Sequence, residues 1–304
     1  MHSTAVPDDA FPGATHQLPV QLWNSATASD VYGRTLNVVC VNRQDKPVGV
    51  WVCPLDGADT PAAQRPVRLL PYASPWVDPG LPPLDRHRVV ASMTATLMDH
   101  VESVELPMDP QFGEVAALIE SGVVALCRHT RMLDTVRDRD FRASYVPTAR
   151  NHIRAAQKKH TVERVQPETF DFPRAIVGQD EAAMLARRKS GLRIGREHPT
   201  LCLAAFDSAG VCRGQVFVMQ SDSAAILMHS WFDRTATRGV PSLLVDAAIE
   251  VAAKELGAAH FDFEGSVIPS IDQFMAGFGA RAAAYPHIQW RRSGMSLPRA
   301  AHFG

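Results

Sequence analysis

The feature that most constrains the fold of this chain is the pattern of its last third. Three segments rich in β-branched and other apolar residues, 201–206, 211–220 and 224–231, are separated only by short polar stretches. This spacing predicts three consecutive antiparallel strands. Pro241 then opens a predicted helix, and Gly257 stands where a left-handed helix stop is favoured. A meander that runs on into a helix places the chain in the α/β (α+β) class.

The rest of the chain alternates in the same way. The C-terminal part continues with a strand at 260–264, a short helix at 269–278 and a final strand at 285–290. The first half repeats the order, with elements predicted at 35–41, 48–53, 85–101, 103–106, 113–119 and 123–127. Between them, elements are expected at 148–159, 161–165 and 180–187. No residue-level repeat accompanies this shared order, so we interpret it as an architectural duplication.

Seven prolines interrupt the first half between Pro61 and Pro83. Fixed φ angles and missing N–H donors exclude a helix or a central strand from such a segment. We therefore expect an extended loop there, with large apolar side chains over 70–76.

Composition limits the class of protein further. The 304 residues carry a formal charge of -1, and their length predicts about two domains. No apolar run reaches about 18 residues, and the first residues lack a basic region followed by an apolar one. We expect a soluble cytoplasmic protein without a membrane partner, in which residues 1–16 form a loose leader.

Cysteine and histidine usage argues against a metal centre. The five cysteines are odd in number and widely spaced, and none forms a CxxC pair. We expect all five to be small buried apolar groups. The twelve histidines form no HExxH pattern, so we expect no metal-binding residues.

The stretch FDFEGSVIPSIDQFMAGFGA at 261–280 resembles the FemAB-like branch of the GNAT acyltransferase superfamily. That branch shows a strand ending in aspartate and phenylalanine, then a small or acidic residue, glycine, serine, and a helix closed by a phenylalanine–glycine pair. The basic helix RNHIRAAQKK at 150–159 and the loop RRKSGLRI at 187–194 are also similar to it. The first half matches in outline only, through LLPYASPW at 69–76.

The resemblance implies two tandem GNAT-like domains, each a mixed twisted sheet flanked by helices. We place the N-terminal domain at 17–130 and the catalytic domain at 131–304. It also implies that the strand at 260–264 separates from the strand at 224–231, leaving a gap for an acyl donor.

Two carboxylates are candidates for proton transfer at that gap. Side chains alternate along a strand, so Asp262 and Glu264 are expected on one face of the strand at 260–264. A carboxylate there suits removal of a proton from an attacking ammonium. The alternative is an ordinary acid that caps the next helix or pairs with an arginine.

The residues before Pro241 are candidates for donor binding. Arg238 and Gly239 combine a cation with the positive end of a helix, which is a generic anion site. Acetyl-CoA users of the superfamily show Q/R-x-x-G-x-G/A here, whereas RTATRGVP at 234–241 keeps one glycine. By resemblance, Lys189 and Ser266 join this donor set. A plain helix start with a solvated arginine remains the alternative.

The basic helix is a second candidate for donor binding. Arg150, Arg154 and Lys158 are spaced by four and share a helical face. Residues 125–165 carry ten basic and four acidic side chains. This excess suits a polyanionic donor such as a tRNA acceptor end, although a solvated helix face explains it equally.

The remaining candidates are aromatic residues and a histidine. Tyr285 is a candidate proton donor to the leaving group. The expected acceptor pocket comprises Tyr72, Trp76, His229 and Trp231. Packing within strands and loops is the alternative for each of them.

Together these features predict an amide-forming N-acyltransferase without a tightly bound cofactor. The expected donor is aminoacyl-tRNA, and the expected acceptor is the amine of a small molecule or amino acid. An acyl-CoA-dependent enzyme of the same fold is the first alternative. A noncatalytic ligand-binding module is the second. No Cys–His or Ser–His–Asp order is present, so we expect no acyl-enzyme.

Overall fold

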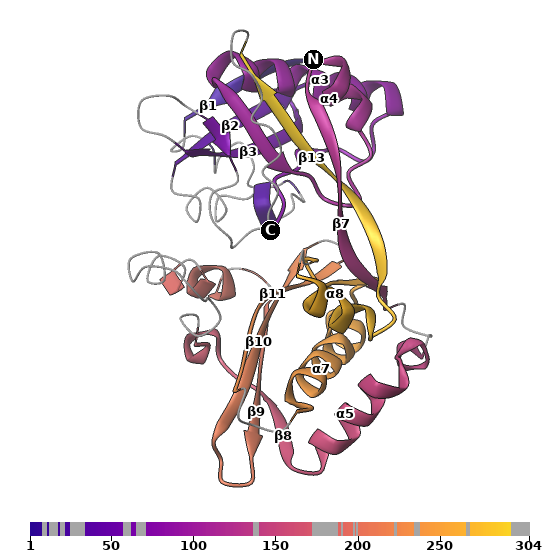
Figure 1. The fold of residues 1–304 in the computed structure, drawn as a ribbon. Helices are drawn as coiled ribbons and strands as arrows, with labels where there is room; N and C mark the ends of the chain where they lie inside the picture. The colour runs from indigo at the N-terminus through magenta and orange to yellow at the C-terminus, as the bar shows by residue number, and fades with distance from the viewer. Residues whose placement is uncertain are drawn as a thin grey trace. The chain divides into compact units, whose positions relative to one another are not determined.

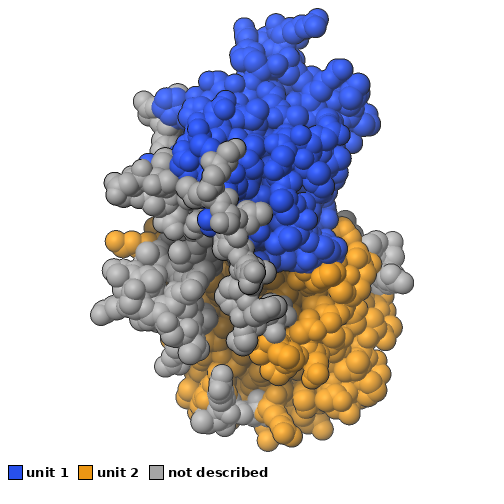
Figure 2. Space-filling model, turned by 45° about the horizontal axis from the view of Figure 1, so that its top comes forward, with its two compact units in different colours: residues 1–128, 284–304 blue, residues 129–283 orange. Residues whose placement is uncertain are grey.

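The structure is a computed structural model. It describes residues 1–7, 11, 18, 22–24, 34–56, 62–64, 71–135, 140–171, 188–189, 191–196, 198, 200–221, 224–233, 238–265 and 268–292. The chain forms two compact units, one of residues 1–128 with 284–304 and one of residues 129–283 (Figure 2). Each unit is described by itself.

The first unit is built on a mixed sheet. Its strand order is β1-β2-β3-β4-β6-β13, and a short strand, β5, pairs with β3 (Figure 1). The strands are β1 (His2–Val6), β2 (Thr35–Val41), β3 (Pro47–Asp56), β4 (Ala62–Gln64), β5 (Trp76–Val77), β6 (Ser103–Pro107) and β13 (Arg281–Arg291). The helical elements are η1 (Leu22–Asn24), α3 (Pro83–His100) and α4 (Val115–Glu120).

Helix α3 covers this sheet through an apolar stripe, which the helical period of the sequence over 85–101 predicts. Val89, Val90, Met93 and Leu97 are fully buried, as their helical spacing requires. Gly49 on β3 lets the helix approach, because a Cβ there would lie 2.5 Å from Val89 Cγ1. The α3 contact therefore fixes the core of the first unit.

Three features of the first unit differ from expectation. Residues His2–Val6, expected within a loose leader, form β1, which pairs antiparallel with β2. Residues Ala62–Gln64 form β4 between β3 and β6, inside the proline-rich segment. This strand lies between Pro61 and Pro66, so its own residues keep their N–H donors. The third difference concerns the end of β13, which we expected in the catalytic domain at 131–304. It belongs to the first unit, because it pairs with β6, with His287 opposite Pro107.

The second unit contains the predicted meander. Its strand order is β7-β12-β11-β10-β9-β8, with β9, β10 and β11 antiparallel neighbours. The strands are β7 (Val124–Asp134), β8 (His160–Arg164), β9 (Thr200–Asp207), β10 (Cys212–Ser221), β11 (Ala224–Phe232) and β12 (His260–Asp262). The helical elements are η2 (Phe141–Ser144), α5 (Pro147–Gln157), η3 (Pro167–Thr169), α7 (Val240–Lys254) and α8 (Pro269–Ala276). The predicted helix at 180–187 lies outside the described residues.

Helices α5 and α7 lie side by side on one face of this sheet (Figure 1). The helical period of the sequence after Pro241 predicts a buried face of Leu244, Ala247, Ala248 and Val251. Leu244 and Ala248 are fully buried, whereas Ala247 and Val251 are half-buried. Burial extends to Asp246, whose carboxylate accepts two hydrogen bonds from Arg142 of η2. Within the described residues, no helix is both long and apolar enough to cross a membrane.

The cysteines are less uniformly buried than expected. Cys40, Cys53 and Cys202 are buried, but Cys212 is half-buried and Cys127 on β7 is exposed. Burial raises the pKa of Cys202 to about 12 and that of Cys53 well above its usual range. The expectation of five buried thiols is therefore wrong for Cys127 and Cys212.

This difference predicts a labelling pattern. With iodoacetamide at pH 8, we expect Cys127 to react first and Cys212 more slowly. The reagent attacks the thiolate, and a buried thiol neither ionises readily nor contacts the reagent. Peptide mass spectrometry after a time course measures the order. Labelling of Cys53 in the folded protein as fast as that of Cys127 would contradict the burial described here.

Candidate active site

The two parallel strands β11 and β12 part within the described residues. Their register has three pairs and stops at Ile226 opposite Asp262. Strand β12 ends at Asp262, whereas β11 runs on to Phe232. On its other side, β11 remains paired with β10 as far as Phe232, opposite Gly214. Pairing between β11 and β12 therefore ends at the place where the resemblance implied a separation.

A β-bulge lies just beyond the last pair. In the β10–β11 register, Phe217 pairs with His229 and Val218 pairs with Leu227, so Met228 is the extra residue. A bulge leaves backbone groups outside the ladder and re-aims the residues that follow. The edge of β11 that faces away from β10 therefore changes direction at Met228, two residues beyond the last pair with β12 at Ile226.

The start of α7 lies at the same end of the sheet. The connection β11–α7–β12 joins parallel strands through a helix, so α7 follows the carboxyl end of β11 at Phe232, six residues beyond the last β11–β12 pair at Ile226. Gly239 is the N-cap and supplies no side-chain cap, and Arg238 is exposed. The first helical N–H groups thus lie toward the carboxyl end of β11, the part of the strand that continues past β12.

The residues after β12 are held by β7. Asp262 is 1% exposed, and its Oδ1 accepts hydrogen bonds from Thr130 Oγ1 at 2.6 Å and from the Glu264 N–H at 2.8 Å. The Phe263 N–H donates to the Arg131 carbonyl at 2.9 Å. Arg131 also forms a two-bond ion pair with Asp272 of α8, which lowers the pKa of that carboxyl.

The chain turns sharply at Glu264 and Gly265, whose φ angles are +62° and +69°. A Cβ on Gly265 would lie 2.9 Å from the His129 carbonyl oxygen, so only glycine fits against β7. The expectation that Asp262 and Glu264 share one strand face is wrong, because the strand ends at Asp262 and alternation stops with it. The two carboxylates occupy different environments.

Gly239 has a packing role. A Cβ at this position would lie 2.2 Å from the His152 carbonyl oxygen of α5. The glycine is therefore required for the close approach of α5 to α7. Of the other predicted donor residues, Lys189 is exposed, and Ser266 lies outside the described residues.

The basic face of α5 lines a groove of about 550 Å³. Arg150 and Arg154 lie in it, and Lys158 caps the end of α5. Its charged lining consists of three arginines and three acids, namely Arg142, Arg150, Arg154, Asp140, Asp246 and Glu250. The charges in the groove therefore balance, so the predicted cationic excess does not gather there.

Arg142 organises this groove. Its guanidinium donates to both carboxylate oxygens of Asp246, at 2.8 and 2.9 Å, and to Glu250 at 2.5 Å. These bonds raise the pKa of Arg142 above its usual range. Burial, with the nearby Asp246 carboxylate, raises the pKa of Tyr145. Arg150 donates to the Tyr145 carbonyl at 2.6 Å, so it too has a structural partner.

The predicted acceptor residues fall in both units, and the predicted proton donor Tyr285 lies in the first. Tyr72, Trp76 and Tyr285 belong to the first unit, where the Tyr72 ring lies 5.7 Å from that of Tyr285. His229 and Trp231 lie on β11 of the second unit. The described contacts bring Tyr72 together with Tyr285. They also support a packing role for Trp231.

Trp231 is held by a polar network on the face of the sheet opposite α7. Its Nε1–H donates to Gln215 Oε1 at 2.8 Å, and that oxygen also accepts from the Asp171 N–H. Gln215 Nε2 donates to the Thr169 carbonyl at 2.9 Å. The His229 ring lies 6.5 Å from the Phe217 ring on the neighbouring strand.

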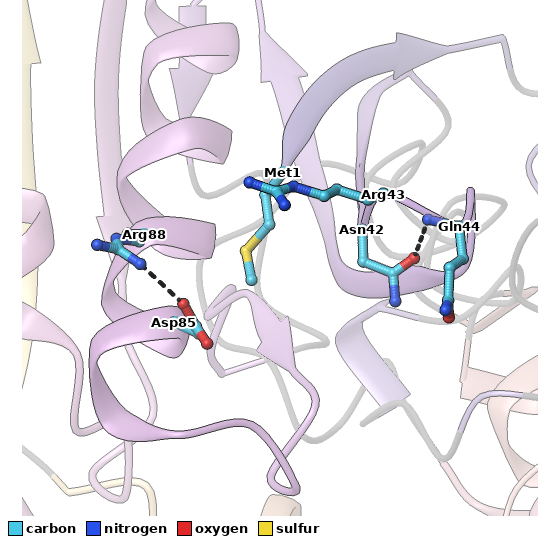
Figure 3. A pocket seen from close by; sticks show the side chains of 6 residues that line it. All are labelled: Met1, Asn42, Arg43, Gln44, Asp85 and Arg88. Atoms are coloured by element: carbon cyan, nitrogen blue, oxygen red, sulfur yellow. Dashed lines mark hydrogen bonds and ion pairs between the residues drawn. The ribbon is translucent and has the colours of Figure 1, made fainter.

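A pocket of about 600 Å³ lies in the first unit between the β2–β3 turn and the start of α3 (Figure 3). In it, Arg88 pairs with Asp85 at 3.1 Å, and Asn42 Oδ1 accepts from the Gln44 N–H. None of the predicted site residues lines this pocket. Across the described residues, no group of three or more histidine, cysteine, aspartate or glutamate side chains gathers to hold a metal ion.

Comparison with known proteins establishes the fold. No protein-family model matches the chain, and no curated protein sequence matches it. A FemX crystal structure is similar over 96% of this chain and 98% of its own, with a TM-score of 0.70 and 10% identity. The C-terminal domain of a lysylphosphatidylglycerol synthetase from Agrobacterium fabrum is similar over 93% and 92%, with a TM-score of 0.58 and 12% identity.

A tandem GNAT protein from the clavulanic acid biosynthesis pathway is similar over 97% of this chain and 99% of its own, with a TM-score of 0.54 and 15% identity. At these identities, the likeness concerns the fold. The expected tandem GNAT-type fold of FemAB-like form is confirmed.

Proposed function

We propose that this protein is an N-acyltransferase whose reaction takes place where β11 and β12 part. The observation that carries this proposal is the end of pairing at Ile226 and Asp262, beside the Met228 bulge on the part of β11 that leads to α7. In the part of the chain that the structure describes, β11 has no strand partner on this side beyond Ile226, and such an edge offers backbone groups to an extended donor. N–H groups directed to one point stabilise an oxyanion.

The reaction is direct transfer. The amine nitrogen attacks the donor carbonyl, a C–N bond forms, and the C–O bond of an ester or the C–S bond of a thioester breaks. A carboxylate of the turn after β12 takes one ammonium proton before attack and passes it to solvent. The second proton, which the nitrogen loses as the amide forms, goes to the leaving oxygen or sulfur. Positioning and oxyanion binding supply most of the rate enhancement, because the donor is already activated.

Two donors fit this geometry. The loop before α7 keeps one glycine, which favours an aminoacyl-tRNA over a coenzyme A thioester. The similarity in fold to a lysylphosphatidylglycerol synthetase domain accords with transfer of an aminoacyl group. The uncapped first turn of α7 beside the exposed Arg238 favours the acyl-CoA alternative. We place aminoacyl-tRNA first and propose the amine of a small molecule or amino acid as acceptor.

Donor consumption distinguishes these alternatives. The full chain is incubated with radiolabelled aminoacyl-tRNA, or with acyl-CoA, and a panel of amines. We expect RNase-sensitive amide product from the charged tRNA. Product from acyl-CoA alone would replace the proposed donor. Turnover of neither donor, with tight binding of one, would favour a noncatalytic module.

A further inference from the structure

Glu264 has a backbone conformation that a glutamate rarely adopts. Among the described residues, only Asp45 and Glu264 combine a side chain with a positive φ, at +56° and +62°. Asp45 lies in the β2–β3 hairpin turn, where aspartate is well tolerated. Glu264 lacks a short side chain of that kind, so its left-handed conformation is strained.

The surroundings of Glu264 hold it in this conformation. Its own N–H is bound by Asp262, and Asp262 is bound in turn by the buried Thr130. The residue before it is fixed to the Arg131 carbonyl. The residue after it, Gly265, packs on β7 with no room for a side chain. Strain of this kind persists where neighbouring interactions over-determine the backbone, and it gathers at functional sites.

The position of the strain agrees with a role in transfer. Glu264 lies two residues after Asp262, the last residue of β12 that pairs with β11. From this point β11 continues without β12 as a partner. Asp262, by contrast, is 1% exposed and directs Oδ1 to two donors within the protein. The two carboxylates are therefore suited to different tasks.

We propose that Glu264 is the carboxylate that contacts the amine acceptor and receives its proton, and that Asp262 and Thr130 are positioning residues. This inference rests on the proposed N-acyltransferase function. In it, the proton moves from the ammonium nitrogen to a Glu264 carboxylate oxygen, and the freed lone pair attacks the donor carbonyl. Asp262 and Thr130 keep the Glu264 backbone left-handed.

Substitution of Glu264 tests the strain and the chemistry separately. We expect Glu264→Gly to raise the midpoint of thermal unfolding by about 2 °C, because glycine adopts this φ freely. The same variant is expected to lose about 100-fold in kcat with the donor that the wild type consumes. Asp45→Gly is the matched control, with a similar stability effect and unchanged turnover.

The pH profile separates base from positioning residue. Glu264→Gln is expected to remove the acidic limb of the kcat profile. Thr130→Val is expected to lower kcat about tenfold and retain that limb, and Thr130→Ser to restore the rate, because the hydroxyl donor returns.

The outcomes distinguish this inference from the function on which it rests. If the wild type consumes no donor, the proposed function fails. If the wild type is active and Glu264→Gln keeps its rate and acidic limb, the assignment of Glu264 is overturned. A lowered unfolding midpoint for Glu264→Gly would overturn the strain argument alone.

Discussion

Replacing Gly239 by alanine is expected to lower the free energy of unfolding by about 3 kcal/mol. The added Cβ would lie 2.2 Å from the His152 carbonyl oxygen and 3.0 Å from the Ala156 Cβ. Both neighbours belong to α5, and a backbone carbonyl has no rotamer to adopt. Relief therefore requires α5 to move away from α7. Urea unfolding followed by circular dichroism measures the loss.

Gly113→Ala is the matched control for this substitution. Nothing lies within 4 Å of a Cβ built at Gly113, so we expect a change below about 1 kcal/mol. Equal stability of the Gly239 and Gly113 variants would show that α5 and α7 do not approach as described. If Gly239 served only to bind an anion, Gly239→Ala would lose donor binding without losing stability.

Replacing Arg142 by methionine is expected to cost about 2–3 kcal/mol of unfolding free energy. The Asp246 side chain, which is 3% exposed, would lose both bonds from the guanidinium. Removing one partner of such a pair leaves a buried charge without compensation. This cost is smaller than that of breaking a fully buried ion pair, because the Arg142 side chain is 40% exposed and solvent screens the pair.

Arg164→Met is the control, since its pair with Glu255 joins side chains that are 53% and 58% exposed. We expect it to cost less than about 1 kcal/mol. Asp246→Asn in the Arg142→Met background should recover part of the lost stability. Loss in the Arg142 variant no greater than in the Arg164 variant would contradict the described ion pair.

The same network predicts a pH dependence. Hydrogen bonds from Lys254 and Arg142 lower the pKa of Glu250. A lowered folded-state pKa stabilises the protein above the unfolded pKa of about 4.3, and this contribution is lost as pH falls through the folded value. Between pH 5 and pH 3, the wild type is therefore expected to lose more stability than Arg142→Met.

Local patterns in the sequence predicted much of the framework. The meander at β9–β11 and the buried stripe of α3 follow from residue periodicity, which directly determines which side chains face a core. The segment at 261–280 predicted the GNAT-type fold because it resembles a known family in its order of residues.

Features that depend on distant partners were not predictable in this way. Thr130 meets Asp262 across 132 positions of sequence, and nothing around Thr130 indicates this contact. The short strand β4 forms because β3 and β6 lie on either side of it. The left-handed Glu264 follows from the fit of Gly265 against β7, whereas strand alternation alone predicted an extended residue.

Mapping where the activated acyl group binds tests the central claim most directly. A donor analogue with a photoreactive acyl group, on tRNA or coenzyme A, is irradiated with the full chain, and cross-linked peptides are identified by mass spectrometry. We predict cross-links within 227–232 of β11 and within 262–265, both suppressed by unmodified donor. Cross-links confined to the groove beside α5, or to the pocket between the β2–β3 turn and the start of α3, would contradict transfer where β11 and β12 cease to pair.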